Sequence, residues 1–596
     1  MTIYRRVIWD IETNGLLKTM DKIHCIGIQC LDTLEYTGFK PDQITEALDI
    51  IKNAESNIGH NTIGFDIPAV QKIYPDWKPK GKVIDTLVLS RLFKADLFND
   101  DFTSKTLPEG FQKKLYGSHS LKAWGMRLSD HKIDYSGGFE TFNEDMFTYM
   151  EQDVRLTTLL YTKLMQDKDF TQKTIDLEHD LAEICYRIGN NGWTFNMQKA
   201  SKLYGKLSQR RLDLSNELET LFEPWEIKTP FTPKRNDKKR GYEAGVTINK
   251  IKTVYFNPNS RKHIAKCLKD KYKWKPEKWT PTGEPKVDEN ILINLPYPEA
   301  KKLAEFFLVQ KRIAMLAEGE QAWMRLTDDD GKLRHTIISG SCVSRRASHR
   351  SPNLAQVPST RAVYGKECRE LFGVPDGWKL VGSDLSGLEL RCLAAVLDDG
   401  GDYGKQIMEG DIHTHNMLMA GIDDSDGNGR ARSKSFIYSL IFGGGDALIG
   451  KIVGGNATAG KKLKNQFNQN VPAFKSLQEE LRAAYKKKGF IKSISGSKLY
   501  CRSEHRLLSQ LLQSSGAIIA MEWLRLMDKR IQDEKLDSKI VAWVHDEVQI
   551  ACPATEANYV GNNITSRTAE EAGKAYGFVI PIESEFSVGE NWATTH

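Results

Sequence analysis

Four acids and one tyrosine near the start of the chain have the types and spacing of a two-metal site. Asp10 and Glu12 stand two residues apart in VIWDIET, a strand-like stretch, so both side chains point to one face. Tyr149 and Asp153 stand four residues apart in a helical stretch and share one helix face. With Asp66 of GHNTIGFD they suit Mg²⁺ or Mn²⁺, and such a cation pair activates water against a phosphodiester. The Asp10–Glu12 pair alone is better explained as a solvated strand end.

Three further acids form a second candidate set. Asp384 ends the strand-like stretch KLVGSD, and Asp546 and Glu547 lie between two apolar stretches typical of a hairpin, KIVAWV and VQIACP. A desolvated carboxylate is costly unless it is paired or bound to a cation. Two strands presenting Asp384 and Asp546 to two Mg²⁺ ions would offset this cost and build a phosphoryl-transfer site. Taken singly, either motif is better explained as strand-end acids that cap local turns.

A regular stripe of side chains lies between these acids, in GRARSKSFIYSLIFGGGD. Arg430, Lys434, Tyr438 and Phe442 recur every four residues, which keeps them on one slowly drifting helix face. Two cations followed by two aromatic rings suit a triphosphate at one end and a base at the other. His413, just upstream, could add a donor to the phosphates. The alternative is a core-facing aromatic stripe with extended Lys and Arg stems.

The elements that must position these residues follow from length and periodicity. A chain of 596 residues exceeds one hydrophobic core, so several domains are expected. Alternating strand-like and helix-like stretches predict an α/β domain over the first 166 residues. Long helices are expected at 170–225 and 298–326, loops at 340–360, and helices broken by glycines at 411–490.

Composition excludes several classes of protein. No apolar run approaches the roughly 18–20 residues that span a bilayer, and the N-terminal residues MTIYRRVIWDIET lack the apolar core of a signal peptide. Nine scattered cysteines without a CxxC pair speak against a disulfide framework and a zinc site. A protein of the reducing cytoplasm is therefore expected.

A basic block accounts for more than the net charge of +6. Residues 226–286 hold 17 Lys and Arg against 6 Asp and Glu, interleaved with aromatic residues such as Trp274 and Trp279. This mixture suits a phosphate backbone better than a membrane, because no apolar helix face accompanies it. A solvated loop without a binding role explains the charge equally well.

The first acidic set resembles the DEDD-type 3′→5′ proofreading exonucleases in order and spacing, in the subtype with a tyrosine in its last motif. The resemblance implies an α/β, RNase H-like domain in which Tyr149 orients the attacking water. It also implies the metal ligands, which are Asp10, Glu12, Asp66 and Asp153. None of the four acids is missing, so an active exonuclease is expected.

Segments spread over most of the chain resemble family A DNA polymerases. They are VIDTLVLSRLF (83–93), GSHSLKAWG (117–125), PNLAQVP (352–358), SGLELRCLA (386–394), LLQSSGA (511–517) and AWVHDE (542–547). The resemblance implies an α+β right-hand polymerase behind the exonuclease domain, acting as a phage replicase in the cytoplasm of an infected bacterium. It divides the chain into an exonuclease domain at 1–166, linker helices and thumb at 167–335, palm at 336–410, fingers at 411–500 and a second palm part at 501–596.

The resemblance also implies residue roles. Asp384, Asp546 and the backbone carbonyl of Leu385 would ligate two Mg²⁺ ions, for which Mn²⁺ can substitute, and Glu547 would play a secondary part. The implied nucleotide-binding residues are Arg430, Lys434 and His413 at the triphosphate, Tyr438 at the sugar and base, and Glu389 as the gate against a ribose 2′-hydroxyl. The implied DNA contacts are Arg346 and Gln513 in the minor groove, His545 at the primer end, and Phe442 near the template base.

Some features depart from this family. Ser439 stands where a glycine is usual and Phe442 where tyrosine is commoner, which concerns fidelity and template placement rather than the chemistry. Phage members carry a long basic thumb insertion that recruits thioredoxin, whereas the interval at about 225–254 is short here, so thioredoxin dependence is expected to be weak or absent. The remaining basic residues, expected to touch DNA directly, are Lys234, Arg235, Lys238, Lys239 and Arg240. No 5′-nuclease module is expected before the first strand.

The partners implied are primer–template DNA and deoxynucleoside triphosphates, with a phage helicase–primase and a single-strand binding protein as further candidates. Three other functions are less favoured. A nuclease with a decayed polymerase half would not keep Asp384, Lys434 and Asp546. A non-catalytic nucleic-acid-binding protein would not carry two acidic sets that repel phosphate, and a single-subunit RNA polymerase would not need Glu389 or the exonuclease motifs.

Overall fold

The computed structural model describes residues 4–130, 132 and 135–596, which divide into two compact units. The larger unit contains Met1–Trp193, Arg334–Val357 and Gly373–His596, and the smaller contains Thr194–Leu333 and Pro358–Phe372. The finer division into five domains stays a prediction.

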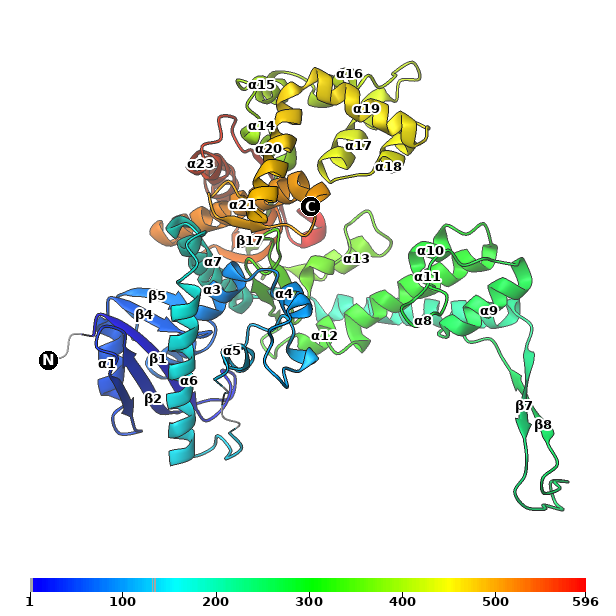
Figure 1. The fold of residues 1–596 in the computed structure, drawn as a ribbon, viewed down its shortest axis with the longest axis horizontal. Helices are drawn as coiled ribbons and strands as arrows, with labels where there is room; N and C mark the ends of the chain where they lie inside the picture. Colours follow the sequence, from blue (N-terminus) through cyan, green and yellow to red (C-terminus); the bar gives the residue numbers. More distant parts are fainter. Residues whose placement is uncertain (1–3, 131, 133–134) are drawn as a thin grey trace. The chain divides into compact units, whose positions relative to one another are not determined.

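The N-terminal part of the larger unit is an α/β layer arrangement on a five-stranded mixed sheet in the order β3-β2-β1-β4-β5 (Figure 1). β1 pairs antiparallel with β2 and parallel with β4. The strands are β1 (Arg6–Thr13), β2 (Ile23–Cys30), β3 (Tyr36–Phe39), β4 (Ser56–Gly59) and β5 (Lys82–Asp85). The helices are α1 (Ile44–Asn53), α2 (Asp66–Ile73), α3 (Thr86–Phe93), α4 (Leu97–Thr103), α5 (Leu121–Arg127) and α6 (Glu144–Leu164).

Alternation along β1 decides which helix each of its side chains meets. The odd-numbered residues pack in one core with α1, whereas Ile8 packs with Val154 of α6. Asp10 and Glu12 lie two and four residues after Ile8 on the strand, so their side chains point to the same face as Ile8, the face that α6 covers. Gly27, opposite Asp10 on β2, lets α6 approach closely, because a Cβ there would lie 3.0 Å from Val154 Cγ2.

The C-terminal part of the larger unit is built on a four-stranded antiparallel sheet in the order β16-β17-β13-β18. Its apolar side chains share the largest core with the long helix α21. The strands are β13 (Trp378–Leu385), β16 (Lys539–Val544), β17 (Glu547–Pro553) and β18 (Ser584–Gly589). The helices are α7 (Gln172–Asn191), α14 (Leu388–Val396), α21 (Leu507–Asp533), α22 (Ala557–Tyr559) and α23 (Arg567–Ala575).

Between α14 and α21 the chain is helical with glycine breaks, as the sequence predicts. These helices are α15 (Asp402–Glu409), α16 (Ile412–Ala420), α17 (Gly429–Ile441), α18 (Asp446–Ile452), α19 (Ala457–Asn470) and α20 (Pro472–Lys488). Two short hairpins complete the larger unit, β10 (Thr336–Ile338) with β11 (Ser348–Arg350), and β14 (Phe490–Lys492) with β15 (Lys498–Tyr500).

The smaller unit is mainly helical, and its long helices α8 (Met197–Leu221) and α11 (Pro298–Ile313) pack against each other. The shorter elements are β6 (Trp193–Phe195), α9 (Arg261–Tyr272), α10 (Glu289–Ile293), α12 (Trp323–Leu326), β9 (Lys332–Leu333), α13 (Gly365–Arg369) and β12 (Phe372–Gly373). In neither unit does a described helix have the length and apolar character needed to cross a bilayer.

The basic segment, which the sequence explains equally well as a solvated loop or as a phosphate-binding segment, contains an antiparallel hairpin. β7 (Trp225–Phe231) pairs with β8 (Ile248–Val254) over their full length, and most of their side chains are exposed. In β7 the aromatic and β-branched residues 225, 227, 229 and 231 alternate with charged residues and a proline, which fits a strand, whereas β8 does not alternate regularly. Pro230 and the dense lysines obscure this pattern in the sequence.

Candidate active sites

The predicted exonuclease acids gather between β1 and α6. Carboxylate oxygens of Asp10, Glu12 and Asp153 all lie within 4.8 Å of one another. Asp66 begins α2 and is buried. Burial, then the charges of Asp66 and Asp153, raises the pKa of Asp10 well above its ordinary value. Burial likewise raises the pKa of Glu12 to about 9 and that of Asp66 to about 8, so these acids hold protons unless a cation replaces them.

A lysine lies among these acids. The Lys132 ammonium forms an ion pair with Asp153 Oδ2 and lies 4.5 Å from the ring centroid of Tyr149. Asp153 Oδ1 is buried and accepts no hydrogen bond from any described residue. A buried carboxylate oxygen without a donor, next to two further carboxylates, is a ligand set that fits a divalent cation. Lys132 supplies positive charge at the same position.

An open cavity of about 750 Å³ borders the acids. Its size lies in the usual range for small-ligand sites, roughly 300–1,000 Å³. Its lining combines acids, bases and an aromatic ring, including Asp10, Asp153, Tyr149, Lys132, Arg91, Arg350, His60 and His119. Burial lowers the pKa of His60 to about 3 and that of His119 to about 4. Both histidines are therefore neutral at pH 7.

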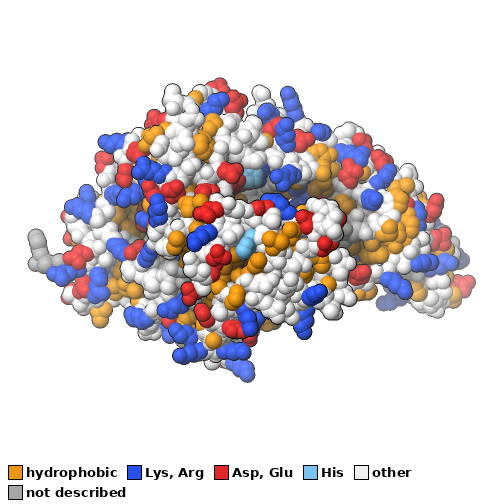
Figure 2. All heavy atoms as spheres, turned by 90° about the horizontal axis from the view of Figure 1, so that it is seen from above, with side chains coloured by type: hydrophobic (Ala, Val, Ile, Leu, Met, Phe, Trp, Pro, Cys, Tyr) orange, Lys and Arg blue, Asp and Glu red, His pale blue; other side chains and the backbone are white. Residues whose placement is uncertain are grey.

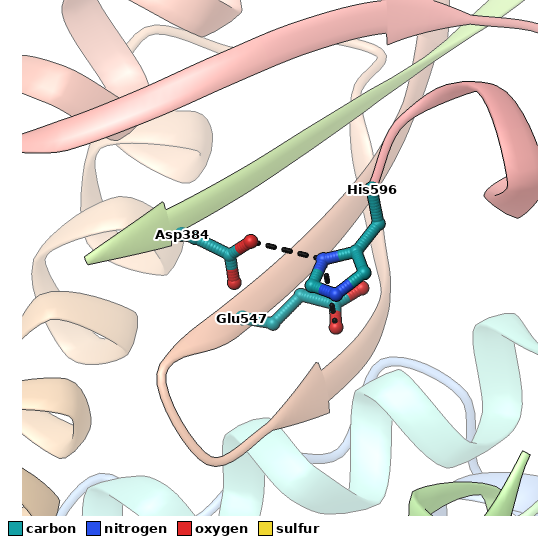
Figure 3. Close-up of side chains that lie close together, drawn as sticks. All are labelled: Asp384, Glu547 and His596. Carbon is teal, nitrogen blue, oxygen red and sulfur yellow. Dashed lines mark ion pairs between the residues drawn. The ribbon is translucent and has the colours of Figure 1, made fainter. Parts of the chain in front are cut away.

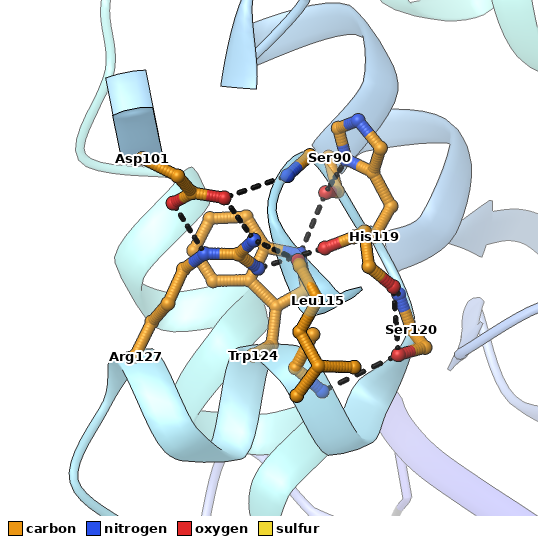
Figure 4. A network of polar contacts seen from close by, with 10 residues as sticks. Ser90, Asp101, Leu115, His119, Ser120, Trp124 and Arg127 are labelled. Atoms are coloured by element: carbon orange, nitrogen blue, oxygen red, sulfur yellow. Dashed lines mark hydrogen bonds and ion pairs between the residues drawn. The ribbon is translucent and has the colours of Figure 1, made fainter. Parts of the chain in front are cut away.

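A polar network fixes the loop that carries His119 into this cavity wall (Figure 4). Ser90 Oγ lies 2.6 Å from His119 Nδ1 and accepts a hydrogen bond of 2.8 Å from Trp124 Nε1. Arg127 donates to the two oxygens of Asp101, over 3.0 Å and 2.6 Å. The contacts of Ser90 join the segments VIDTLVLSRLF and GSHSLKAWG.

The second acidic set lies on the antiparallel sheet of the same unit. Asp384 on β13 and Glu547 on β17 are directly opposite each other, and His596 lies between their carboxylates (Figure 3). His596 Nδ1 is 2.9 Å from Asp384 Oδ2 and 3.3 Å from Glu547 Oε2. Glu547 is buried and accepts hydrogen bonds from Trp592 Nε1 and, over 2.8 Å, from Gln549 Nε2. Asp384, Glu547 and His596 each offer one atom within 4.8 Å of the others.

Asp546 lies in the turn between β16 and β17, and its carboxylate is not part of that group. Its backbone carbonyl accepts a hydrogen bond of 3.1 Å from the N–H of Leu385. Burial, then the charges of Asp384 and Glu389, raises the pKa of Asp546 to about 6. A cation shared by Asp384 and Asp546 would relieve the repulsion between their carboxylates.

Five predicted site residues from four separate segments line one small cavity of about 20 Å³. They are Arg346, Glu389, Gln513, His545 and Asp546. His545 adopts the left-handed conformation, with φ of 62°, which allows the tight turn that exposes it beside Asp546. The fold therefore brings the predicted primer-end residues and the predicted ribose gate next to the second acidic set.

Three residues of the predicted stripe, Arg430, Lys434 and Tyr438, lie on α17, and Phe442 is the C-cap residue directly after it. Arg430 and Lys434 are exposed on α17, and Tyr438 stacks on Phe442 with ring centroids 6.3 Å apart. Residues at the start of α16 face this stripe. Arg430 forms an ion pair with the N-cap residue Asp411, at 2.5 Å and 3.1 Å.

His413 also borders the stripe, with its ring centroid 6.4 Å from that of Tyr438. Burial, then the charges of Arg430 and Lys434, lowers the pKa of His413, so it is mostly neutral at pH 7 and can accept or donate one hydrogen bond.

The basic residues expected to touch DNA belong to the other unit. All five are exposed in the connection between β7 and β8: Lys234, Arg235, Lys238, Lys239 and Arg240. At the base of this connection the Lys250 ammonium lies 3.5 Å from the ring centroid of Phe231. On the face seen in Figure 2, basic and acidic side chains are interspersed.

Comparison with known proteins decides the family. The model of DNA polymerase family A matches residues 235–594. This chain belongs to DNA polymerase family A. It is 32% identical to the DNA-directed DNA polymerase of Escherichia phage T7, over 99% of this chain and 100% of that protein. The polymerase of Enterobacteria phage T3 gives the same values.

More distant relatives agree. DNA polymerase I of Aquifex aeolicus is 22% identical, over 98% of this chain and 95% of its own. The solved POL domain of Pol1 from M. smegmatis, in complex with DNA primer-template and dNTP, matches with a TM-score of 0.72 at 16% identity. That match covers 99% of this chain and 95% of the other, which supports the right-hand polymerase fold.

The sequence did not indicate three residues of this family A polymerase that the structure adds to the sites. Trp592 and His596 reach the second acidic set from the far end of the chain, without a spacing that predicts it. Lys132 lies 21 residues before its partner Asp153 in a segment without regular periodicity. Each depends on a tertiary contact rather than on a local pattern.

Proposed function

We propose that this family A polymerase extends a DNA primer on a DNA template from deoxynucleoside triphosphates, and that a separate 3′→5′ exonuclease site proofreads the product. One observation carries the proposal. Among the described residues, two groups of three or more potential metal-ligating side chains come together, and each contains two or more of the predicted acids. The groups lie on different sheets, which supports two active sites.

Each site would bind Mg²⁺, two ions per site, with Mn²⁺ as a substitute. Bound cations would generate the nucleophile and neutralise charge on the leaving oxygen. In the exonuclease the ligands would be Asp10, Glu12, Asp66 and Asp153, and the Tyr149 hydroxyl would orient the attacking water. In the polymerase the ligands would be Asp384, Asp546 and the carbonyl of Leu385, with Glu547 beside them.

The remaining predicted contacts would serve the polymerase. Arg430, Lys434 and His413 would bind the triphosphate, and Arg430 would exchange Asp411 for phosphate. Glu389 would exclude a ribose 2′-hydroxyl. DNA would be contacted by Arg346 and Gln513 in the minor groove, His545 at the primer end and Phe442 near the template base.

Tyr438 should make chain-terminating dideoxynucleotides good substrates, because its hydroxyl can replace the contact that a 3′-hydroxyl makes. Tyr438→Phe removes that hydroxyl and keeps the ring. Discrimination against dideoxynucleotides should rise about 10- to 100-fold, the usual worth of one well-placed hydrogen bond to a charged group. Competition between dTTP and ddTTP in single-nucleotide extension measures this ratio. An unchanged ratio would show that Tyr438 has no such role.

The polymerase would act in the cytoplasm of an infected bacterium, on primer–template DNA. A helicase–primase and a single-strand binding protein of the phage are candidate partners. The short β7–β8 hairpin supports weak or absent thioredoxin dependence, so added thioredoxin should not lengthen the products of a single binding event.

The exposed basic residues between β7 and β8 should contribute to DNA affinity through phosphate contacts. Neutralising Lys234, Arg235, Lys238, Lys239 and Arg240 together should flatten the dependence of log K on log salt by about one unit per lost contact. Fluorescence anisotropy of a primer–template at several salt concentrations measures the slope. The matched change neutralises five exposed basic residues of α20 and should flatten the slope less: Lys475, Arg482, Lys486, Lys487 and Lys488. If the hairpin variant and the α20 variant showed equal slopes, the hairpin would contact another partner or none.

The proposal is tested with a 5′-labelled primer on a longer template in Mg²⁺. Lengthening with all four deoxynucleotides and shortening without them is the expected result. Shortening in both lanes would indicate either an inactive polymerase site or a dominant exonuclease, and Asp10→Ala distinguishes them. No change in either lane would overturn the enzymatic function.

A further inference from the structure

One arginine in the proposed exonuclease cavity has no counter-ion among the described residues. Arg91 lies on α3, is half-buried and lines the cavity that contains Asp10 and Asp153. In the described part of the chain its guanidinium takes part in no hydrogen bond and no ion pair. Asp85, the acid whose charge acts on Arg91, accepts instead from the backbone N–H groups of residues 61, 63 and 87. Burial lowers the pKa of Arg91, the charge of Asp85 opposes this, and the charge of Arg350 adds to it. A partly desolvated cation without a partner is unfavourable in the free protein.

A second arginine lines the same cavity from a distant segment. Arg350 ends β11, more than 250 residues after Arg91, is exposed and has no described hydrogen-bond or ion-pair partner through its side chain. The two guanidiniums are close enough for the charge of Arg350 to lower the pKa of Arg91. Like charges held together without a counter-ion predict an anion that binds between them.

The other groups of the cavity favour the same ligand. His60 and His119 are neutral at pH 7, so they do not add charge to the pair. Lys132 is paired with Asp153 and lies over Tyr149, so its charge is engaged on the acids. The cavity therefore combines an acidic cluster, suited to cations, with a separate basic pair suited to an anion.

We propose that Arg91 and Arg350 form an anion subsite that binds a backbone phosphate of a single-stranded DNA 3′ end. The inference rests on the proposed exonuclease activity. The phosphate at the acidic cluster would be the one that is cut, and every other phosphate of a 3′ end lies on its 5′ side. The arginine pair therefore holds a phosphate upstream of the cut bond. Because Arg350 comes from the second half of the chain, the exonuclease domain alone would have an incomplete substrate site.

The test is degradation of a 5′-labelled single-stranded oligodeoxynucleotide by the full chain in Mg²⁺. In Arg91→Gln and Arg350→Gln, KM should rise about tenfold while kcat stays within about twofold, because the contact is remote from the cut bond. The dependence of log KM on log salt should flatten by about 0.7 per lost phosphate contact. Arg91→Lys should recover part of the loss. Arg5→Gln makes the same change at an exposed arginine, which pairs with Glu55 over 3.8 Å, and should behave as wild type.

Replacing single backbone phosphates of the DNA with uncharged linkages shows which phosphate the arginine pair binds. A methylphosphonate placed at one upstream position should raise KM for the wild type, and should have no further effect in the variant that has lost the matching arginine. The melting temperature of Arg91→Gln should not fall, because no described contact is lost. A fall in melting temperature with kcat and KM reduced together would assign Arg91 a structural role and overturn the subsite.

Two further outcomes separate the possibilities. If the wild type shortens DNA, Asp10→Ala does not, and both arginine variants keep the wild-type KM, the subsite is wrong and the exonuclease stands. If the wild type does not shorten DNA in Mg²⁺ or Mn²⁺, the proposed exonuclease itself has failed, and the subsite fails with it.

Discussion

Asp384→Ala is expected to reduce primer extension by about 10³-fold or more and to leave the shortening of DNA 3′ ends intact, and Asp10→Ala is expected to do the reverse. Each substitution removes one ligand from a cluster whose bound cations would neutralise charge in the transition state and lower the activation free energy by several kcal/mol. Each 1.36 kcal/mol of activation free energy changes the rate tenfold. Asp384 belongs to β13 and Asp10 to β1, in different sheets with different cores. A loss at one site should therefore not spread to the other.

The measurement is the rate of single-nucleotide addition, and of removal, on the same labelled primer–template. Asp42→Ala is a matched control, because Asp42 is an exposed aspartate of the N-terminal α/β part of the chain and lies outside both acidic clusters. It should leave both rates unchanged. If Asp384→Ala abolished both activities, the two clusters would not be independent sites. If Asp10→Ala left shortening unchanged, the β1–α6 cluster would not be the exonuclease.

Local patterns in the sequence predict the positions of most site acids. The two-residue spacing of Asp10 and Glu12 on β1 places both side chains on one face of the strand. The apolar stretches on either side of Asp546 predict the β16–β17 hairpin. Both predictions hold because period-two alternation and turn residues are properties of a few adjacent residues. The four-residue spacing of the α17 stripe is local in the same sense.

Partners that depend on tertiary packing are not predictable in this way. The sequence points to Asp384 and Asp546 as the pair, whereas the register of β13 and β17 sets Asp384 opposite Glu547 and leaves Asp546 in the turn. His596 and Arg350 reach their sites from segments with no periodic signal. Their positions are set by the packing of sheets and helices, so no local pattern in a single sequence predicts them.

The acids around β1 and α6 should bind Mg²⁺ with an affinity that rises with pH. The pKa of Glu12 is about 9 and that of Asp66 about 8, both raised first by burial, so below these values the metal-free site holds protons that Mg²⁺ must displace. Each displaced proton should increase the apparent affinity about tenfold per pH unit, up to about pH 8. The same shifts make the metal-free fold bind protons that the unfolded chain has lost. These groups therefore contribute less stability as pH rises from about 4.5 toward 9.

Calorimetric titration of Asp384→Ala with Mg²⁺ isolates this cluster, because the other site has lost a ligand. Titrations at pH 6, 7 and 8, in buffers of different ionisation enthalpy, give both the affinity and the number of protons released. Glu12→Gln removes one titrating group, so it should bind more weakly and release about one proton fewer. An affinity independent of pH, with no proton release, would mean that the acids are already ionised without metal. Lys132 would then suffice to balance their charge, and Lys132→Met should raise the pKa of Asp153 enough to restore the pH dependence.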